Sequence, residues 1–183
     1  AILAGNALAT HDLEGAIFQT ALGQDIYTQK SCCNGHYHHL DVLNQVREYA
    51  TLAEFVAAKN IGDSVVAACV RTCTPIVLAG SIRDDGPLPE VLADAYAAQN
   101  AMRQHAKQAT TMICLATQLH SIAAGNMTPA YQAIDGSVRP VFLYSVDVSE
   151  FAVNKLKDRG SLEVTSIVTN IQDFLVHIQR ELV

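Results

Sequence analysis

The chain has 183 residues, half of them apolar and 16% charged, and its formal net charge is −6. This length and composition fit one globular domain with a sizeable core and argue against a disordered protein. The acidic balance, without a lysine- or arginine-rich run, argues against nucleic acid and acidic membrane surfaces as partners. We expect no membrane span, because no apolar run approaches the ~20 residues that cross a bilayer, and we find no signal-peptide pattern.

The cysteine content indicates a reducing environment. The five cysteines are odd in number and form no disulfide framework, so we expect a cytoplasmic protein. They are Cys32, Cys33, Cys69, Cys73 and Cys114. The chain begins at Ala1 and opens directly on an apolar, strand-like run. We therefore expect upstream elements of the fold to be missing.

Short apolar runs alternate with helical patterns along the chain. Strands are predicted at residues 2–4, 75–79, 112–116, 141–146 and 164–168. Helices are predicted at residues 12–22, 40–49, 52–59, 63–73, 89–108, 121–126, 149–157 and 170–182, with a polar loop at 23–35 and a turn-rich segment at 127–139. Expected helix starts are Asp12, the Thr51–Glu54 capping box, Asp63, Pro89, Ser149 and Asn170.

Five short strands separated by helices predict an α/β fold, a three-layer sandwich with a mostly parallel sheet and helices on both faces. In such sheets ligands bind beyond the carboxyl ends of the strands. The loops that follow Gly5, Gly80, Ala116, Val146 and Val168 are therefore the candidate ligand loops.

The densest of these loops is "SIRDDGPLP", Ser81–Pro89. Arg83 can fork onto a carboxylate or a phosphate. Of the adjacent acids Asp84 and Asp85, one can accept from a ribose or an amine while the other holds the loop. The alternative is a solvated turn with Gly86 at positive φ.

The other loops each leave a choice between a ligand role and a structural role. Backbone N–H groups around Asn6, before a helix, favour an anion such as phosphate, unless they only cap that helix. His120, after Thr117, is either an acid–base group or a structural histidine. Asp147 ends an apolar strand, where an acid commonly takes ribose hydroxyls, or it is a turn residue. The Gly-x-Gly-x-x-Gly fingerprint is absent from the chain.

A second dense cluster is "CCNGHYHHL", Cys32–Leu40. Its spacing fits no standard zinc set and includes no Cys-x-x-Cys, so we predict no metal site and expect a loop that lines the active cleft. Metal binding through His36 and His38 is the alternative. Cys69 and Cys73, one helical turn apart, and Cys114, within a strand, are expected in the core.

Several of these segments resemble the archaeal-type ornithine cyclodeaminase family, formerly labelled lysine-oxoglutarate reductase/saccharopine dehydrogenase-like. Its members include the carboxyl-terminal part of bifunctional arginine dihydrolase/ornithine cyclodeaminases. The resemblance covers nearly the whole chain. It is carried by "LAGNALATHDLE", "GHYHHL", "VLAGSIRDDGPLPEV", "AQNAMRQH", "LATQLHSIAAGN" and "KLKDRGS…IVTN".

The resemblance implies one Rossmann-like NAD-binding domain over residues 1–183. Carried over motif by motif, the implied NAD contacts are Asn6, Ala7, Asp85, Thr117, Gln118, Leu119, His120, Asp147, Asn170 and Ile171. The family usually has Asp where Asn170 stands, and the segment 127–139 is longer than the usual link before Asp147.

The activity implied by the resemblance is conversion of ornithine to proline with loss of ammonia, with NAD recycled. Arg83 is then expected to bind the substrate carboxylate, Asp84 an amine, and the histidines His36, His38 and His39 to close the cleft. The expected partners are the amino-acid substrate and either further copies of the chain or other segments of a larger enzyme. Two alternatives are a non-catalytic NAD-binding module and another NAD-dependent amino-acid dehydrogenase.

Overall fold

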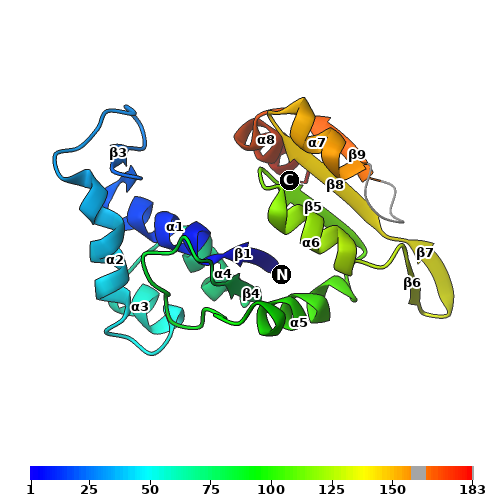
Figure 1. Ribbon diagram of the computed structural model, residues 1–183, viewed down its shortest axis with the longest axis horizontal. Coiled ribbons are helices and arrows are strands. Elements are labelled where there is room, and N and C mark those ends of the chain that lie inside the picture. The colour runs from blue at the N-terminus through cyan, green and yellow to red at the C-terminus, as the bar shows by residue number, and fades with distance from the viewer. Residues whose placement is uncertain (158–163, 183) are drawn as a thin grey trace. The chain divides into compact units, whose positions relative to one another are not determined.

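The structure is a computed structural model that describes residues 1–157 and 164–182 (Figure 1). The chain divides into two units, Ala1–Asn100 and Ala101–Val183, and each is described by itself. The sequence predicts one domain over the whole chain, and that stays a prediction.

The first unit is built on two parallel strands, β1 (Ile2–Gly5) and β4 (Ile76–Ala79), which lie side by side in Figure 1. Both end at the same edge, since Gly5 pairs with Ala79. Helices α1 (Asn6–Phe18), α2 (His38–Val46), α3 (Leu52–Ala58) and α4 (Val65–Thr72) complete the unit. Its core is apolar, with fully buried side chains that include Leu13, Val42, Val46, Phe55 and Val66.

A small hairpin occupies part of the segment for which the sequence predicts only a polar loop. Strands β2 (Thr20–Ala21) and β3 (Gln24–Asp25) pair antiparallel, and the 3-10 turn η1 (Gly35–Tyr37) follows. Gly23 adopts φ +76° and lies against Gly35; a Cβ on Gly23 would stand 2.6 Å from the Gly35 carbonyl carbon. The two glycines therefore allow the chain to cross itself at this point.

The second unit contains a three-stranded parallel sheet in the order β5 (Thr111–Leu115), β8 (Phe142–Asp147), β9 (Val164–Val168). Helices α6 (Leu119–Met127), α7 (Glu150–Lys157) and α8 (Ile171–Leu182) alternate with these strands, and α5 (Ala95–Ala106) runs across the boundary between the units. The parallel strands and intervening helices confirm the predicted α/β class.

The segment expected to be turn-rich contains a second antiparallel hairpin, β6 (Tyr131–Ile134) and β7 (Ser137–Pro140). Its turn is Asp135–Gly136, with φ +51° and +79°. An Asp-Gly pair at positive φ is a preferred two-residue hairpin turn, so the sequence did contain a signal for this hairpin.

Several predicted helix boundaries are confirmed and others are wrong. The Thr51 side chain accepts from the Glu54 N–H at 3.1 Å, and Asn170 Oδ1 accepts from the Gln172 N–H at 2.8 Å, so both predicted caps form. The Ser149 hydroxyl accepts from the Ala152 N–H at 3.4 Å at the start of α7. Pro89 does not start a helix, because α5 begins at Ala95.

The predicted cap Asp12 lies inside α1, which begins six residues earlier than expected. Its carboxylate instead accepts from the N–H groups of Val65 and Val66, both at 2.8 Å, and so caps α4 from outside. Ser64, not Asp63, is the residue that caps α4 from within the chain. Cys73 ends α4 in the left-handed region at φ +52° and is exposed, so its predicted core position is wrong.

Each helix in the described part of the chain is too short or too polar to cross a bilayer.

Candidate functional site

The loops after β1 and β4 are joined by the side chain of Asn6, the first residue of α1. Its Nδ2 donates to the Gly86 carbonyl at 2.9 Å, and its Oδ1 accepts from the Leu88 N–H at 3.0 Å. The residue is only 2% exposed. The structure thus brings together two of the loops that the sequence selected, and both hydrogen-bonding ends of the Asn6 amide are used to do so.

Arg47, at the end of α2, holds the same loop from another side. Its Nε donates to the Pro87 carbonyl at 3.3 Å. Its guanidinium covers Gly86: a Cβ there would lie 2.9 Å from Arg47 Cζ. Gly86 has φ +140°, which confirms the predicted positive φ and requires glycine.

The two adjacent acids of this loop have different surroundings. Asp84 folds back, and its Oδ2 accepts from the Ser81 N–H at 2.8 Å. Asp85 turns toward α2, where its Oδ2 lies 3.0 Å from His39 Nε2, and its side chain is 60% exposed. Asp84 therefore stabilises the loop conformation, whereas the Asp85 carboxylate stays largely exposed. Arg83 is exposed on the same loop, so its predicted role in binding a substrate carboxylate stays a prediction.

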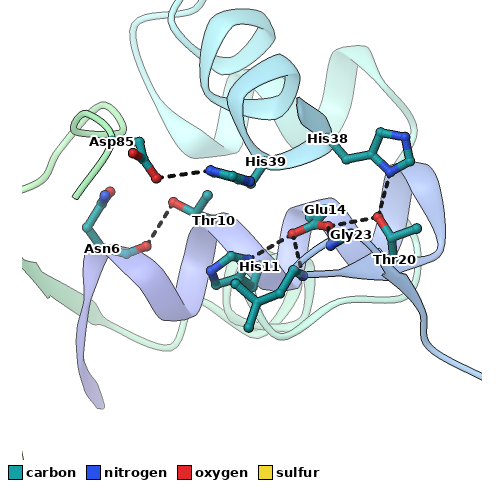
Figure 2. Close-up of polar contacts among 10 residues, drawn as sticks. Asn6, Thr10, His11, Glu14, Thr20, Gly23, His38, His39 and Asp85 are labelled. Carbon is teal, nitrogen blue, oxygen red and sulfur yellow. Dashed lines mark hydrogen bonds and ion pairs between the residues drawn. The ribbon is translucent and has the colours of Figure 1, made fainter. Parts of the chain in front are cut away.

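A buried carboxylate, that of Glu14, lies on α1 against the β2–β3 hairpin. Glu14 is fully buried and accepts from Thr20 Oγ1 at 2.8 Å and from the N–H groups of Gly23 and Leu22 at 3.2 and 3.3 Å. His11 Nδ1 lies 2.8 Å from its Oε2 (Figure 2). Burial alone would raise the pKa of Glu14, but these hydrogen bonds together outweigh it and hold that pKa below its usual value.

The three clustered histidines do not act together. His39 reaches Asp85, whereas His38 Nδ1 bonds to Thr20 Oγ1 at 2.9 Å and its ring stacks on Phe18 at 4.7 Å. The exposed His36 packs on its neighbour Tyr37, with ring centroids 4.1 Å apart. Within the described residues no group of three or more His, Cys, Asp or Glu side chains is arranged to hold a metal ion.

Sequence reasoning missed His11 and Glu14. They lie three residues apart on a helix, a spacing that places two side chains on one face. Glu14 also stands within the predominantly apolar run of α1, where a carboxylate needs partners. Those two signals together could have indicated a hydrogen-bonded contact between His11 and a buried Glu14.

In the second unit, the other predicted site residues follow the carboxyl ends of β5, β8 and β9. These ends are neighbours: Leu115 pairs with Val146, and Asp147 pairs with Val168. Asp147 Oδ1 accepts from the Ser149 N–H at 2.8 Å, so its side chain also orders the start of α7. Thr117, Gln118 and Leu119 are exposed and His120 is half-buried, at the start of α6.

The last predicted pair, Asn170 and Ile171, opens α8. The Asn170 side chain caps that helix, as the sequence predicts. In the first unit, Ala7 lies exposed in the first turn of α1. That helix starts after Gly5 without a side-chain cap and without an acidic residue in its first turn, so the positive end of its dipole is not offset by its own side chains there.

A family model matches residues 1–178, and its description is arginine dihydrolase ArgZ-like, C-terminal, Rossmann fold. The chain belongs to this family. The membership confirms the predicted Rossmann fold and the resemblance that the motif "AGSIRDDGPLP" carries. The quoted motif "KLKDRGS" runs into residues 158–161, which lie outside the described residues.

Some relatives of the chain are named for their activity. The chain is 41% identical to an ornithine cyclodeaminase of Methanopyrus kandleri, over 99% of this chain and 42% of that protein. It is also 41% identical to the bifunctional arginine dihydrolase/ornithine cyclodeaminase AgrE of Nostoc sp., over 100% of this chain and 25% of that protein. The chain thus spans less than half the length of the curated relatives it matches.

Two solved ArgZ-like relatives have the same fold. An LOR/SDH protein of Methanococcus maripaludis matches with a TM-score of 0.87 and 38% identity, over 99% of this chain and 52% of that one. AgrE in a ternary complex with ornithine and NAD+ matches with a TM-score of 0.85 and 40% identity, over 98% of this chain and 26% of that one.

Proposed function

We propose that this chain is the NAD-binding Rossmann part of an NAD-dependent ornithine cyclodeaminase, which converts ornithine to proline and ammonia. The observation that carries the proposal is the similarity, at 40% identity over 98% of the chain, to a relative whose complex holds ornithine and NAD+. We place the enzyme in the cytoplasm and expect it to act with further copies of itself or with other segments of a larger protein.

The residues at the strand ends fit a dinucleotide. The first turn of α1, at Asn6 and Ala7, offers backbone N–H groups to a diphosphate, and no acidic side chain in that turn opposes it. Asp147 ends β8 with a half-buried carboxylate suited to ribose hydroxyls. Further NAD contacts that we propose are Asp85 in the first unit and, in the second unit, Thr117, Gln118, Leu119, His120, Asn170 and Ile171.

In the proposed reaction, the cofactor and the protein contribute different functions. NAD, when bound, supplies the hydride acceptor and donor for the α-carbon of the substrate. We assign to Arg83 the binding of the substrate carboxylate, because a guanidinium fork matches its two oxygens. Asp84 holds the loop through the Ser81 N–H, so an additional role for it in binding an amine is the weaker assignment.

The test is product formation by the purified full-length protein that contains this chain. With ornithine and a catalytic amount of NAD, we expect proline and ammonia in equal amounts and no net NADH. Net accumulation of NADH would instead identify an amino-acid dehydrogenase and overturn the proposal.

A second candidate is an NAD-binding module without turnover. The observation that favours it is Asn170, which stands where the family usually has Asp and whose side chain caps α8. Saturable NAD binding without proline formation would identify this alternative.

A further inference from the structure

One contact links the predicted cofactor loop to α2, whose His39 was expected from the sequence only to help close the cleft. His39 is the second residue of α2, and its Nε2 lies 3.0 Å from Asp85 Oδ2, across 46 residues of sequence. Figure 2 shows the two side chains pointing toward one another. The His39 side chain is 18% exposed and that of Asp85 is 60% exposed. The better-buried partner is therefore the imidazole.

The direction of this hydrogen bond follows from the chemistry of the pair. An ionised carboxylate only accepts hydrogen bonds, so Nε2 must carry the proton and donate it. The other ring nitrogen, Nδ1, is buried and has no hydrogen-bond partner among the described residues. Among the described residues, the hydrogen bond with Asp85 is therefore the one that holds the His39 ring.

The imidazole is also packed from below. The ring of His11 lies against it, with centroids 5.9 Å apart and an angle of 53° between the planes. His11 is in turn held by the fully buried Glu14 at 2.8 Å. The His11 ring that packs against His39 is thus itself held by a hydrogen bond. This packing limits the movement of the His39 ring.

The backbone of the Asp85 loop has its own anchors. Asn6 and Arg47 bond to the carbonyls of Gly86 and Pro87, and neither contact restrains the Asp85 side chain. A carboxylate that is 60% exposed on a loop samples several rotamers unless a partner selects one. His39 is the partner that the structure provides.

We propose that His39 is a positioning residue for NAD binding: it holds the Asp85 carboxylate through Oδ2 so that Oδ1 faces the cofactor and accepts from its hydroxyl groups. The inference rests on the proposed function, because it needs Asp85 in the cofactor site. It adds a residue of α2, outside the five strand-end loops, to the groups that determine cofactor affinity.

The rival explanation is an exposed ion pair that only ties α2 to the loop, and such pairs contribute little to stability. The two explanations differ in how the variants combine. If His39 acts through Asp85, its removal has no further effect on NAD affinity once Asp85 is gone. If His39 only ties α2 to the loop, the two single variants weaken NAD binding independently. The double variant then weakens it by the product of their two factors.

The experiment measures the NAD dissociation constant of the full chain by calorimetry, for His39→Ala, His39→Gln, Asp85→Ala and the double variant. We expect His39→Ala to weaken binding about tenfold, since it removes a hydrogen bond to a charged group. Glutamine carries an N–H donor near the position of Nε2, so His39→Gln should recover most of that affinity. The double variant should match Asp85→Ala.

The matched control is His177→Ala, which removes an exposed histidine of α8 that has no role in the proposed site and should leave affinity unchanged. Unchanged affinity in His39→Ala, no recovery in His39→Gln, or multiplied losses in the double variant would each overturn the inference. If His39→Ala does not fold, His39→Gln and the exposed Asp85→Ala still decide the question. Failure of the unmodified chain to bind NAD would instead overturn the proposed function.

Discussion

The side chain of Asn6 accepts a hydrogen bond at 3.0 Å from the N–H of Leu88, a residue 82 positions further along the chain. Its amide also donates to the Gly86 carbonyl at 2.9 Å. One buried amide thus binds both a backbone N–H and a backbone C=O of this irregular loop. Neither group takes part in a helix or a strand. The loop after β4 depends on the first residue of α1 for its conformation.

Replacing Asn6 by alanine should destabilise the chain by about 3 kcal/mol, because it leaves two backbone groups without their described partner at a buried position. NAD affinity should fall in parallel, since the loop that carries Asp85 loses its anchor. Urea denaturation and NAD titration measure the two effects. Asn126→Ala, on the exposed face of α6, is the control and should change neither. Full stability in Asn6→Ala would show that the loop is held by other contacts.

Replacing Glu14 by glutamine should cost about 2 kcal/mol at neutral pH, because an amide cannot accept all the hydrogen bonds that the carboxylate receives. The pKa of Glu14 is lowered in the folded chain, so the carboxylate contributes stability above its unfolded pKa. That contribution is lost as the pH falls through the unfolded and then the folded pKa. The difference between the two proteins should therefore shrink as the pH falls.

The measurement is the free energy of unfolding against pH, and Glu48→Gln, at an exposed position, is its control. Two parallel curves, with the same offset at neutral and acid pH, would contradict the role assigned to the Glu14 carboxylate.

The five parallel strands β1, β4, β5, β8 and β9 were predictable, because each is a short apolar run whose residues favour extended structure. The loops at their carboxyl ends followed from the same alternation. Helix starts were less predictable: Asp12 has the residue type of a cap, yet it caps α4, 53 residues away, rather than its own helix. A residue's type indicates that it can cap a helix, and only tertiary contacts determine which helix it caps.

The loops of the candidate site could be predicted from the sequence. The contacts that their side chains make could not. The adjacent acids Asp84 and Asp85 are equivalent in sequence, and the fold separates them by pointing one at the Ser81 N–H and the other at His39. The pairing of His39 with Asp85 spans 46 residues and has no local sequence pattern. Contacts of this kind depend on how α2 packs against the loop.

Replacing Gly86 by alanine should destabilise the loop by about 2 kcal/mol, because φ +140° is strained for any residue with a Cβ. The new methyl group would also displace the Arg47 guanidinium. The double variant with Arg47→Ala removes that clash and leaves the backbone strain, so it should not restore stability. Gly62→Ala, at a site with no atom within 4 Å of the added Cβ, is the control. Thermal unfolding measures all four; equal Tm values would contradict the prediction.

Replacing Asp147 by alanine should weaken NAD binding about tenfold or more, since a carboxylate at this strand end is our proposed ribose ligand. Asp147→Asn keeps an oxygen that can accept from the Ser149 N–H and removes only the charge. Comparing the NAD affinities of the two variants separates the effect of Asp147 on the start of α7 from its proposed contact with the cofactor. Calorimetric titration with NAD gives both affinities. If Asp147→Ala binds as tightly as the unmodified chain, Asp147 lies outside the site.

The five cysteines should fall into two reactivity classes. Cys33 and Cys73 are exposed and Cys32 is half-buried, whereas Cys69 and Cys114 are buried. Burial raises the pKa of both buried thiols, and the negative charge of Asp12 raises that of Cys69 further. Since the thiolate is the nucleophile, iodoacetamide at neutral pH should label the first group and leave the second until denaturant is added. Peptide mass spectrometry measures each site. Early labelling of Cys114 in the native protein would show that β5 is open to solvent.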